Sequence, residues 1–190
     1  MKRVGILGGS FNPAHGGHRR VAMAALDRLG LDEVWLMVSP QNPLKGTAGM
    51  APLADRLASA RAVARHPRIK ARALEVDLGT RYAVDTARAL VRRFPGHRFI
   101  WLMGEDNLVE LHRWRDWRGF ARTVAIAVFA RPGYGGAART APAMAWLRRW
   151  RHGARDWARW NPPAILFVDM RLDPRSASAI RRTRPDWAQT

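Results

Sequence analysis

The sequence predicts a doubly wound α/β fold, in which helices cover both faces of one parallel β-sheet. Short apolar, β-branched runs alternate with longer amphipathic stretches along the 190 residues. The runs are almost continuously apolar, as is typical of strands that are buried on both faces. Glycine-rich or polar motifs follow directly after several runs, where the carboxyl ends of the strands bind ligands in such sheets.

The predicted elements follow one another without an internal repeat, so we expect a single domain that spans residues 1–190. Pro52 stands at the start of the second helix, Pro95 and Gly96 follow the third, and 132–143 is a Gly- and Ala-rich loop. The predicted strands are Val4–Leu7, Val34–Val38, Ile69–Val76, Arg98–Met103, Val124–Phe129 and Ala164–Val168. The predicted helices are Gly17–Leu29, Leu53–Arg65, Tyr82–Arg93, a broken segment Asn107–Ala121, and Ala143–Trp160.

The segment Gly8–His18, with the sequence GGSFNPAHGGH, is the most informative part of the chain. It joins the first predicted strand to the first predicted helix. Glycines allow the backbone to approach an anion closely, and the start of a helix presents unpaired N–H groups. His15 and His18 are three residues apart, so both imidazoles lie on one face of the first turn. This combination predicts a phosphate-binding site.

The same segment excludes two common nucleotide-binding motifs. It lacks the Gly-Lys-Ser/Thr ending of a P-loop, and it lacks the Gly-x-Gly-x-x-Gly spacing of a dinucleotide fingerprint. The turn is therefore not typical of phosphate-hydrolysing motors or of dehydrogenases.

Composition narrows the classes further. The net charge is +18, but only three of the 33 basic residues are lysines, and the arginines are spread along the chain. We interpret the charge as attraction for anionic substrates, and expect no nucleic-acid partner. No apolar run reaches the roughly 20 residues of a membrane span, so no membrane partner is expected either. The absence of cysteine is compatible with a cytoplasmic protein.

Further motifs occur in order along the chain, and with Gly8–His18 they resemble the nucleotidyltransferase superfamily. The first segment is similar to its Gly-x-Phe-x-Pro-x-His-x-Gly-His signature. Within the superfamily the chain looks like the bacterial nicotinate-nucleotide adenylyltransferases. The other matching segments are Asn42–Lys45, Arg81–Thr86, Gly104–Leu108, His112–Trp114 with Trp117, Ala130–Tyr134 and Arg175–Arg181.

The resemblance implies a Rossmann-like nucleotidyltransferase fold and transfer of an adenylyl group from ATP to nicotinate mononucleotide in NAD biosynthesis. It implies His15, His18 and Arg181 as catalytic residues, and a Mg²⁺ ion that the substrate holds, without a dedicated protein metal site. The implied ATP-binding residues are Gly8, Gly9, Ser10, Phe11, His15, His18, Lys45, Gly104, Asp106, Ser178 and Arg181. The implied binding residues for the mononucleotide are Tyr82, Thr86, Asp106 and Trp114.

Individual roles follow from residue chemistry. An arginine fork meets phosphate oxygens bidentately, and the Asp106 carboxylate is placed to accept from a ribose hydroxyl, or else to cap a helix. Trp114 offers a flat face to a pyridine ring, or packs in the core. The chain departs from the family pattern at Asn12, Arg81, Ala83, Arg175 and Ser178.

Two alternative functions remain open at this point. One is a sister transferase that acts on nicotinamide mononucleotide or phosphopantetheine, or a cytidylyltransferase. The other is a basic nucleic-acid-binding protein, which leaves the two histidines and Arg181 without a role. Formation of a homo-oligomer is also left open.

The predicted helix 143–160 carries a tryptophan stripe. Trp146, Trp150, Trp157 and Trp160 are spaced to share one face, with arginines on the others. Such a stripe can bind a membrane surface or nucleic acid. We favour the commoner interpretation, a face that packs against the protein or a second subunit.

Overall fold

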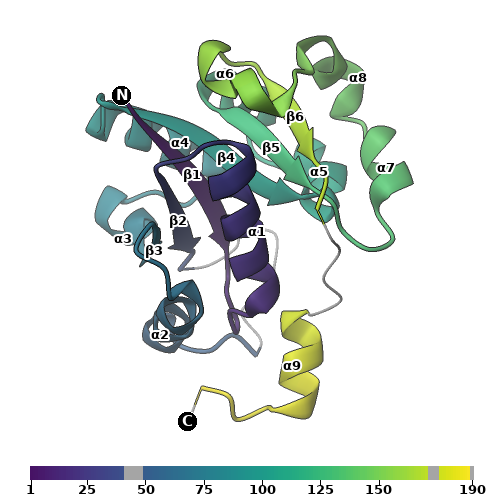
Figure 1. The fold of residues 1–190 in the computed structure, drawn as a ribbon. Helices are drawn as coiled ribbons and strands as arrows, with labels where there is room; N and C mark the ends of the chain where they lie inside the picture. The colour runs from purple at the N-terminus through teal and green to yellow at the C-terminus, as the bar shows by residue number, and fades with distance from the viewer. Residues whose placement is uncertain (41–48, 171–175, 189–190) are drawn as a thin grey trace.

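A computed structural model describes residues 1–40, 49–170 and 176–188 of the chain. Its centre is a six-stranded sheet in the order β3-β2-β1-β4-β5-β6 (Figure 1). All strand pairs are parallel, and the chain order reverses between β1 and β4. The strands are β1 Lys2–Gly9, β2 Glu33–Val38, β3 Ile69–Arg72, β4 His97–Gly104, β5 Ala125–Phe129 and β6 Ile165–Val168. The predicted doubly wound fold is confirmed.

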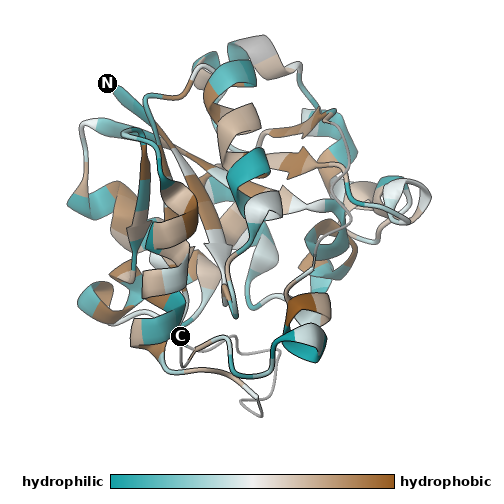
Figure 2. Ribbon diagram, turned by 60° about the horizontal axis from the view of Figure 1, so that its bottom comes forward, coloured by the Kyte–Doolittle hydropathy of each residue, from teal (hydrophilic) through white to brown (hydrophobic). Residues whose placement is uncertain are grey.

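Helices cover both faces of the sheet, and alternate strand residues supply two separate apolar cores. One core joins β-strand residues such as Leu36 and Ile100 to α1 and α2, and the other joins Val4 and Trp101 to the helices from α3 to α8. The strands are largely brown in Figure 2, which marks them as hydrophobic. The helices are α1 Gly16–Arg28, α2 Leu53–Ala64, α3 Leu74–Leu78, α4 Ala83–Arg93, α5 Glu105–Glu110, α6 Trp117–Thr123, α7 Gly135–Arg139, α8 Met144–Leu147 and α9 Ala177–Thr183.

The third strand is shorter than its apolar pattern predicts. The strand β3 ends at Arg72, and Leu74–Leu78 form the short helix α3 instead. Gly79 ends that helix with a positive φ of 62°, a conformation that glycine adopts without a Cβ penalty. A run of apolar residues does not by itself separate a strand from a buried helical turn, and here the C-terminal glycine decides the outcome.

The predicted continuous helix over 143–160 is wrong. The chain forms only the short helix α8 and two 3-10 segments, Arg148–Trp150 and Ala154–Arg159. Between them the backbone is extended: Arg151 bridges to Ile165, and the His152 N–H donates to the Ile165 carbonyl at 2.9 Å. Pairing with Ile165, the first residue of β6, therefore replaces helix formation at this point.

Consequently the four tryptophans do not share a helix face. Trp157 is 1% exposed and its indole N–H donates to the Leu29 carbonyl at 2.8 Å, whereas Trp160 is 39% exposed. On the opposite face of the sheet, the half-buried rings of Trp146 and Trp150 are tilted against each other, with 4.2 Å between their centroids. Within 132–143, predicted as a loop, Gly135–Arg139 form α7.

No helix in the described part of the chain is both long enough and apolar enough to cross a membrane.

Candidate functional site

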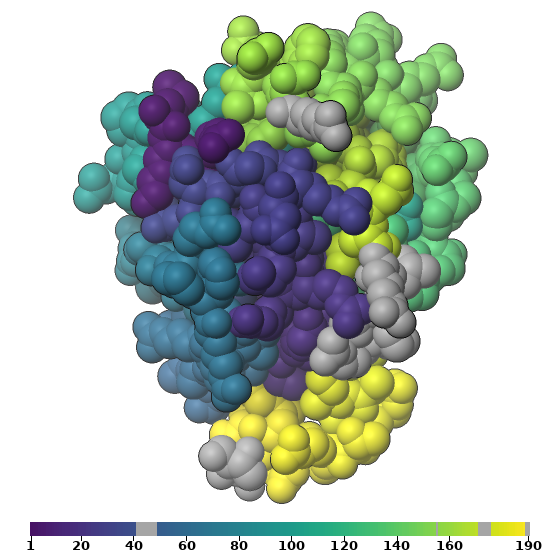
Figure 3. Space-filling view, viewed as in Figure 1, coloured from purple at the N-terminus to yellow at the C-terminus, as the bar shows by residue number. Residues whose placement is uncertain are grey.

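A cavity of about 700 Å³ lies at the carboxyl edge of the sheet, around the point where the strand order reverses. It is lined by the segments that follow β1, β2, β4 and β5, and by Ser176, Ala177 and Ser178 at the start of α9. Figure 1 shows α9 beyond this edge, next to the amino-terminal end of α1, and Figure 3 shows the yellow carboxyl-terminal segment against purple atoms at the bottom of the molecule, far from the amino terminus at the top. The volume suits a small-molecule site.

Glycines near the ends of β1 and β4 leave space for the side chains that line the cavity. A Cβ on Gly8 would lie 3.1 Å from the Trp101 ring, and a Cβ on Gly104 would lie 2.2 Å from the Asp106 carboxylate. Larger residues would therefore displace groups that line the cavity. This close approach is the physical reason for glycine at both positions.

The two histidines form a reciprocal cap at the start of α1. The Gly17 N–H donates to Nδ1 of His15 at 3.1 Å, and the His15 N–H donates to Nδ1 of His18 at 3.0 Å. An imidazole that accepts at Nδ1 and is neutral carries its proton on Nε2. The ring centroids are 3.9 Å apart, so the cap fixes two Nε2–H donors of neighbouring rings that line the cavity.

The loop before the histidines is joined to distant parts of the chain. The Asn12 side chain donates to the Gly49 carbonyl at 2.9 Å and accepts from the Ala51 N–H at 3.2 Å. From α9, Arg181 donates to the Asn12 carbonyl at 2.5 Å and to the Ser178 hydroxyl at 3.2 Å. Arg181 is therefore joined to the loop that leads to His15 and His18.

An acidic pair at the start of α5 holds an arginine at the cavity. The side-chain Nε of Arg131 donates to the Asp106 carboxylate at 3.3 Å. The backbone N–H of Arg131 donates to the buried Glu105 carboxylate at 2.9 Å. The N-cap of α5 is Gly104, and Asp106 lies inside the first turn. Asp106 is thus a partly exposed cavity residue and not the cap that the sequence offered as its alternative role.

Aromatic and cationic side chains also line the cavity. Tyr82 and Trp114 are both half-buried there. The Arg115 guanidinium lies 4.6 Å from the centre of the Tyr82 ring, a cation–π contact. The lining contains four arginines and three acids, which together with the net charge favours an anionic ligand. These charged lining residues are Arg81, Arg113, Arg115, Arg131, Glu75, Asp106 and Glu110.

Thr86, predicted to contact substrate, is instead fully buried and does not line the cavity. Its hydroxyl donates to the Glu75 carboxylate at 3.1 Å and lies 2.9 Å from the Thr80 hydroxyl. Burial raises the pKa of the Glu75 carboxyl, while hydrogen bonds from Ser39 and Thr86 lower it by less. Thr86 therefore supports a buried acid that does line the cavity.

The structure brings most of the other predicted residues to this cavity. Arg181 is not among the lining residues, although it is bonded to the loop beside them, and Lys45 lies outside the described residues. The predicted residues that line the cavity are Gly8, Gly9, Ser10, Phe11, His15, His18, Tyr82, Gly104, Asp106, Trp114 and Ser178.

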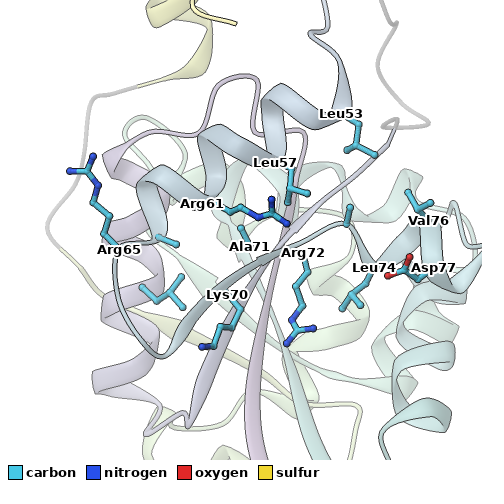
Figure 4. Close-up of a pocket in the computed structure, with 13 residues that line it drawn as sticks. Leu53, Leu57, Arg61, Arg65, Lys70, Ala71, Arg72, Leu74, Val76 and Asp77 are labelled. Carbon is cyan, nitrogen blue, oxygen red and sulfur yellow. The ribbon is translucent and has the colours of Figure 1, made fainter. Parts of the chain in front are cut away.

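A second hollow of about 720 Å³ runs along the free edge of the sheet, beside β3 (Figure 4). Leu57 and Arg61 of α2 line it together with Lys70 and Arg72 of β3. It is open and contains none of the predicted site residues. A lysine on an edge strand discourages pairing with another chain, so this hollow does not change the assignment of the site.

Comparison with known proteins identifies the family of this chain. Residues 6–183 match the cytidylyltransferase-like family. A probable nicotinate-nucleotide adenylyltransferase from Erythrobacter litoralis is 54% identical over 188 residues, which cover 97% of this chain and 86% of the relative. The chain belongs to the cytidylyltransferase-like family, in its nicotinate-nucleotide adenylyltransferase branch. A second relative of the same name from Parvibaculum lavamentivorans is 51% identical over 98% of this chain and 94% of its own.

Solved structures agree with this family fold. A Plasmodium falciparum nicotinic acid mononucleotide adenylyltransferase, complexed with NaAD, superposes with a TM-score of 0.71. It is 15% identical and the match covers 96% of this chain and 83% of that protein. At this identity the likeness concerns the fold, which is the Rossmann-like nucleotidyltransferase fold.

Sequence reasoning missed two buried charged residues at or beside the cavity. Arg56 is 2% exposed and binds the loop before the histidines, and Glu75 is 6% exposed at the cavity. A signal existed for both. Arg56 occupies a core-facing position of a helix with Leu53, Leu57 and Ala60, and Glu75 interrupts an apolar run. Charged residues at such positions are rarely buried without a partner.

Proposed function

We infer that this chain transfers the adenylyl group of ATP to nicotinate mononucleotide, giving deamido-NAD and pyrophosphate. Relatives of about half-identical sequence over nearly the whole chain carry that activity in their names. The observation that carries the inference is the hydrogen bond from Arg181 to the loop that leads to His15 and His18, beside a cavity at the strand switch point.

The reaction requires alignment and charge stabilisation more than acid–base chemistry. The 5′-phosphate of the mononucleotide is already ionised and attacks the α-phosphorus of ATP in line, and pyrophosphate leaves. Negative charge then builds on the oxygens around that phosphorus. We assign the Nε2–H groups of His15 and His18 as donors to those oxygens, because their shared cap fixes both rings before substrate arrives.

The other end of the triphosphate is assigned to α9. A guanidinium has five donors, of which the contacts to Asn12 and Ser178 use two. We propose that Arg181 and Ser178 bind the β- and γ-phosphates, and that backbone N–H groups of 8–11 contribute from the opposite side. Lys45 remains a proposed additional cation for the triphosphate.

The mononucleotide is assigned to the aromatic side of the cavity. Trp114 offers a face to the pyridine ring, Tyr82 lies beside it, and Arg115 adds positive charge that favours a carboxylate-bearing ring over a neutral amide. Asp106 is assigned to a ribose hydroxyl, with Arg131 holding its carboxylate in place.

A Mg²⁺ ion is proposed to accompany the triphosphate, where it would partly neutralise the phosphate charge. The residues that the structure describes contain no cluster of three His, Cys, Asp or Glu side chains that could hold a metal, and Mg²⁺ commonly keeps several waters and few protein ligands. A cytoplasmic location and a single domain over 1–190 are likewise proposed, and a homo-oligomer is left to measurement.

The decisive test is turnover of the purified chain. ATP and Mg²⁺ are combined separately with nicotinate mononucleotide, nicotinamide mononucleotide and phosphopantetheine, and pyrophosphate release is followed. We expect the highest kcat/KM with nicotinate mononucleotide. Turnover with phosphopantetheine alone would assign the chain to the sister transferases, and absence of turnover with all three would refute the proposal.

A further inference from the structure

Arg56 of α2 is almost completely buried, and its partners are backbone carbonyls. Nε donates to the Ala51 carbonyl at 2.8 Å, Nη1 to Ser10 at 2.8 Å and to Ser39 at 2.6 Å, and Nη2 to Pro40 at 3.0 Å. One planar guanidinium thereby joins the loop after β1, the end of β2 and the segment before α2. The fixed fork of arginine suits such a junction because its donors point in different directions in one plane.

Ser59 lies one helical turn further along α2 and holds the other end of the same loop. Its hydroxyl accepts from the Ala14 N–H at 3.0 Å. Residues three apart lie on one side of a helix, so Arg56 and Ser59 present one face of α2 to the loop. Between their two contacts, Asn12 reaches back to Gly49 and Ala51 just before the helix.

We propose that Arg56 and Ser59 are positioning residues for ATP, which act through the loop 10–14 that they fasten at both ends. This rests on the proposed function, because the loop leads directly into the His15 cap. Arg56 engages the Ser10 carbonyl, an oxygen that would repel a phosphate, and Ser59 binds the N–H of Ala14, the residue that immediately precedes His15. The helix thereby sets where the two imidazoles stand relative to the triphosphate.

Arg19 provides a matched comparison on the same pair of helices. Its Nη1 donates to the carbonyls of Val63, Ala64 and Arg65 at the opposite end of α2. It therefore joins α1 to α2 through carbonyl contacts, as Arg56 joins its segments, but these contacts do not include the loop 10–14. Replacing either arginine is expected to lower the stability of the fold. Only replacement of Arg56 is expected to lower kcat/KM for ATP as well.

The experiment compares Arg56→Lys, Ser59→Ala and Arg19→Lys with the wild-type chain. Lysine keeps the charge, but its single nitrogen cannot reach carbonyls on both sides of the former guanidinium. The measurements are kcat, KM for ATP, KM for nicotinate mononucleotide, and the rise of Tm on adding ATP, which reports binding to the folded state.

We expect Arg56→Lys to lower kcat/KM for ATP by about 100-fold, the scale of a misplaced reacting group. Ser59→Ala is expected to lower it about fivefold, the equivalent of one ordinary hydrogen bond. In both variants KM for nicotinate mononucleotide stays within about twofold of wild type, and the ATP-induced rise of Tm shrinks. Arg19→Lys lowers Tm without changing either KM.

Unchanged ATP parameters in a folded Arg56→Lys variant would overturn the inference, as would equal losses for ATP in Arg19→Lys. If Arg56→Lys does not fold, Ser59→Ala decides: normal kcat/KM for ATP in that variant overturns the inference. Lack of turnover by the wild-type chain refutes the proposed function instead, so the two failures are distinguishable.

Discussion

The histidine loop and the tryptophan-rich segment 144–160 are both fixed in place, but by different forces. The loop between β1 and α1 is held by hydrogen bonds from side chains to backbone groups, contributed by Asn12, Arg56, Ser59 and Arg181. The segment 144–160 pairs with β6 at Arg151 and His152, and its side chains are held by ring contacts, cation–π contacts and the burial of Trp157.

The contacts of the histidine loop mainly fix the position of groups, whereas those of the tryptophan-rich segment mainly stabilise the fold. Hydrogen bonds are directional and each is worth about 1 kcal/mol net, so they set geometry more than they stabilise the fold. Burial of a large ring is non-directional and is worth several kcal/mol. Substitutions in the loop are therefore expected to change catalysis with little loss of stability, and buried ring substitutions to do the reverse.

The largest effect on folding is expected from Trp157→Ala. Removal of this buried ring leaves a cavity and an unpaired Leu29 carbonyl, so the free energy of unfolding should fall by about 3–5 kcal/mol. Chemical denaturation measures the loss, and the KM for ATP of the folded fraction should stay unchanged. A stability loss below about 1 kcal/mol would break the contrast between the two regions.

The largest effect on catalysis is expected from His18→Ala. Loss of one donor at the reacting phosphate should lower kcat by about 10²–10³-fold. The cap is lost as well, so His18→Asn is the control, because its side-chain oxygen can still accept the His15 N–H. Near-normal kcat in either variant would show that His18 does not act on the phosphate.

Glu75→Gln tests the buried acid that lines the cavity. Since burial raises the carboxyl pKa, the folded chain binds this proton more tightly than the unfolded chain. The stability that the proton contributes is present at low pH, and is lost as pH rises from the ordinary 4.5 through the raised value. The Tm of the Gln variant should therefore rise relative to the Tm of wild type as the pH rises above 4.5. A difference in Tm that does not change with pH would contradict the raised pKa of the Glu75 carboxyl.

Trp150→Ala should have the smallest effect. This half-exposed ring contacts Trp146 at 4.2 Å and lies under the Arg149 guanidinium at 5.1 Å. Loss of these surface contacts should cost about 0.5–1.5 kcal/mol in a monomer, with unchanged kinetics. Size-exclusion chromatography of both proteins adds a test of the predicted alternative, because a subunit contact here would make the variant dissociate.

Most of the fold could be predicted from local pattern. Strand–helix alternation and near-continuous apolar strands predicted the parallel sheet, and the spacing of His15 and His18 predicted their shared position at the start of α1. The errors lie where the pattern is locally ambiguous. The run that ends at Val76 turns into α3 after Arg72, and the tryptophan spacing gave way to pairing of Arg151 and His152 with β6.

The sequence by itself determined the order of the elements and the chemistry at the start of α1, because periodicity and capping act over three or four residues. Only the tertiary structure decided which groups hold that chemistry in place. Arg181 reaches Asn12 across 169 residues, and Arg56 reaches Ser10 across 46. Contacts over such distances depend on the strand order and on packing of the two cores, which no local pattern specifies.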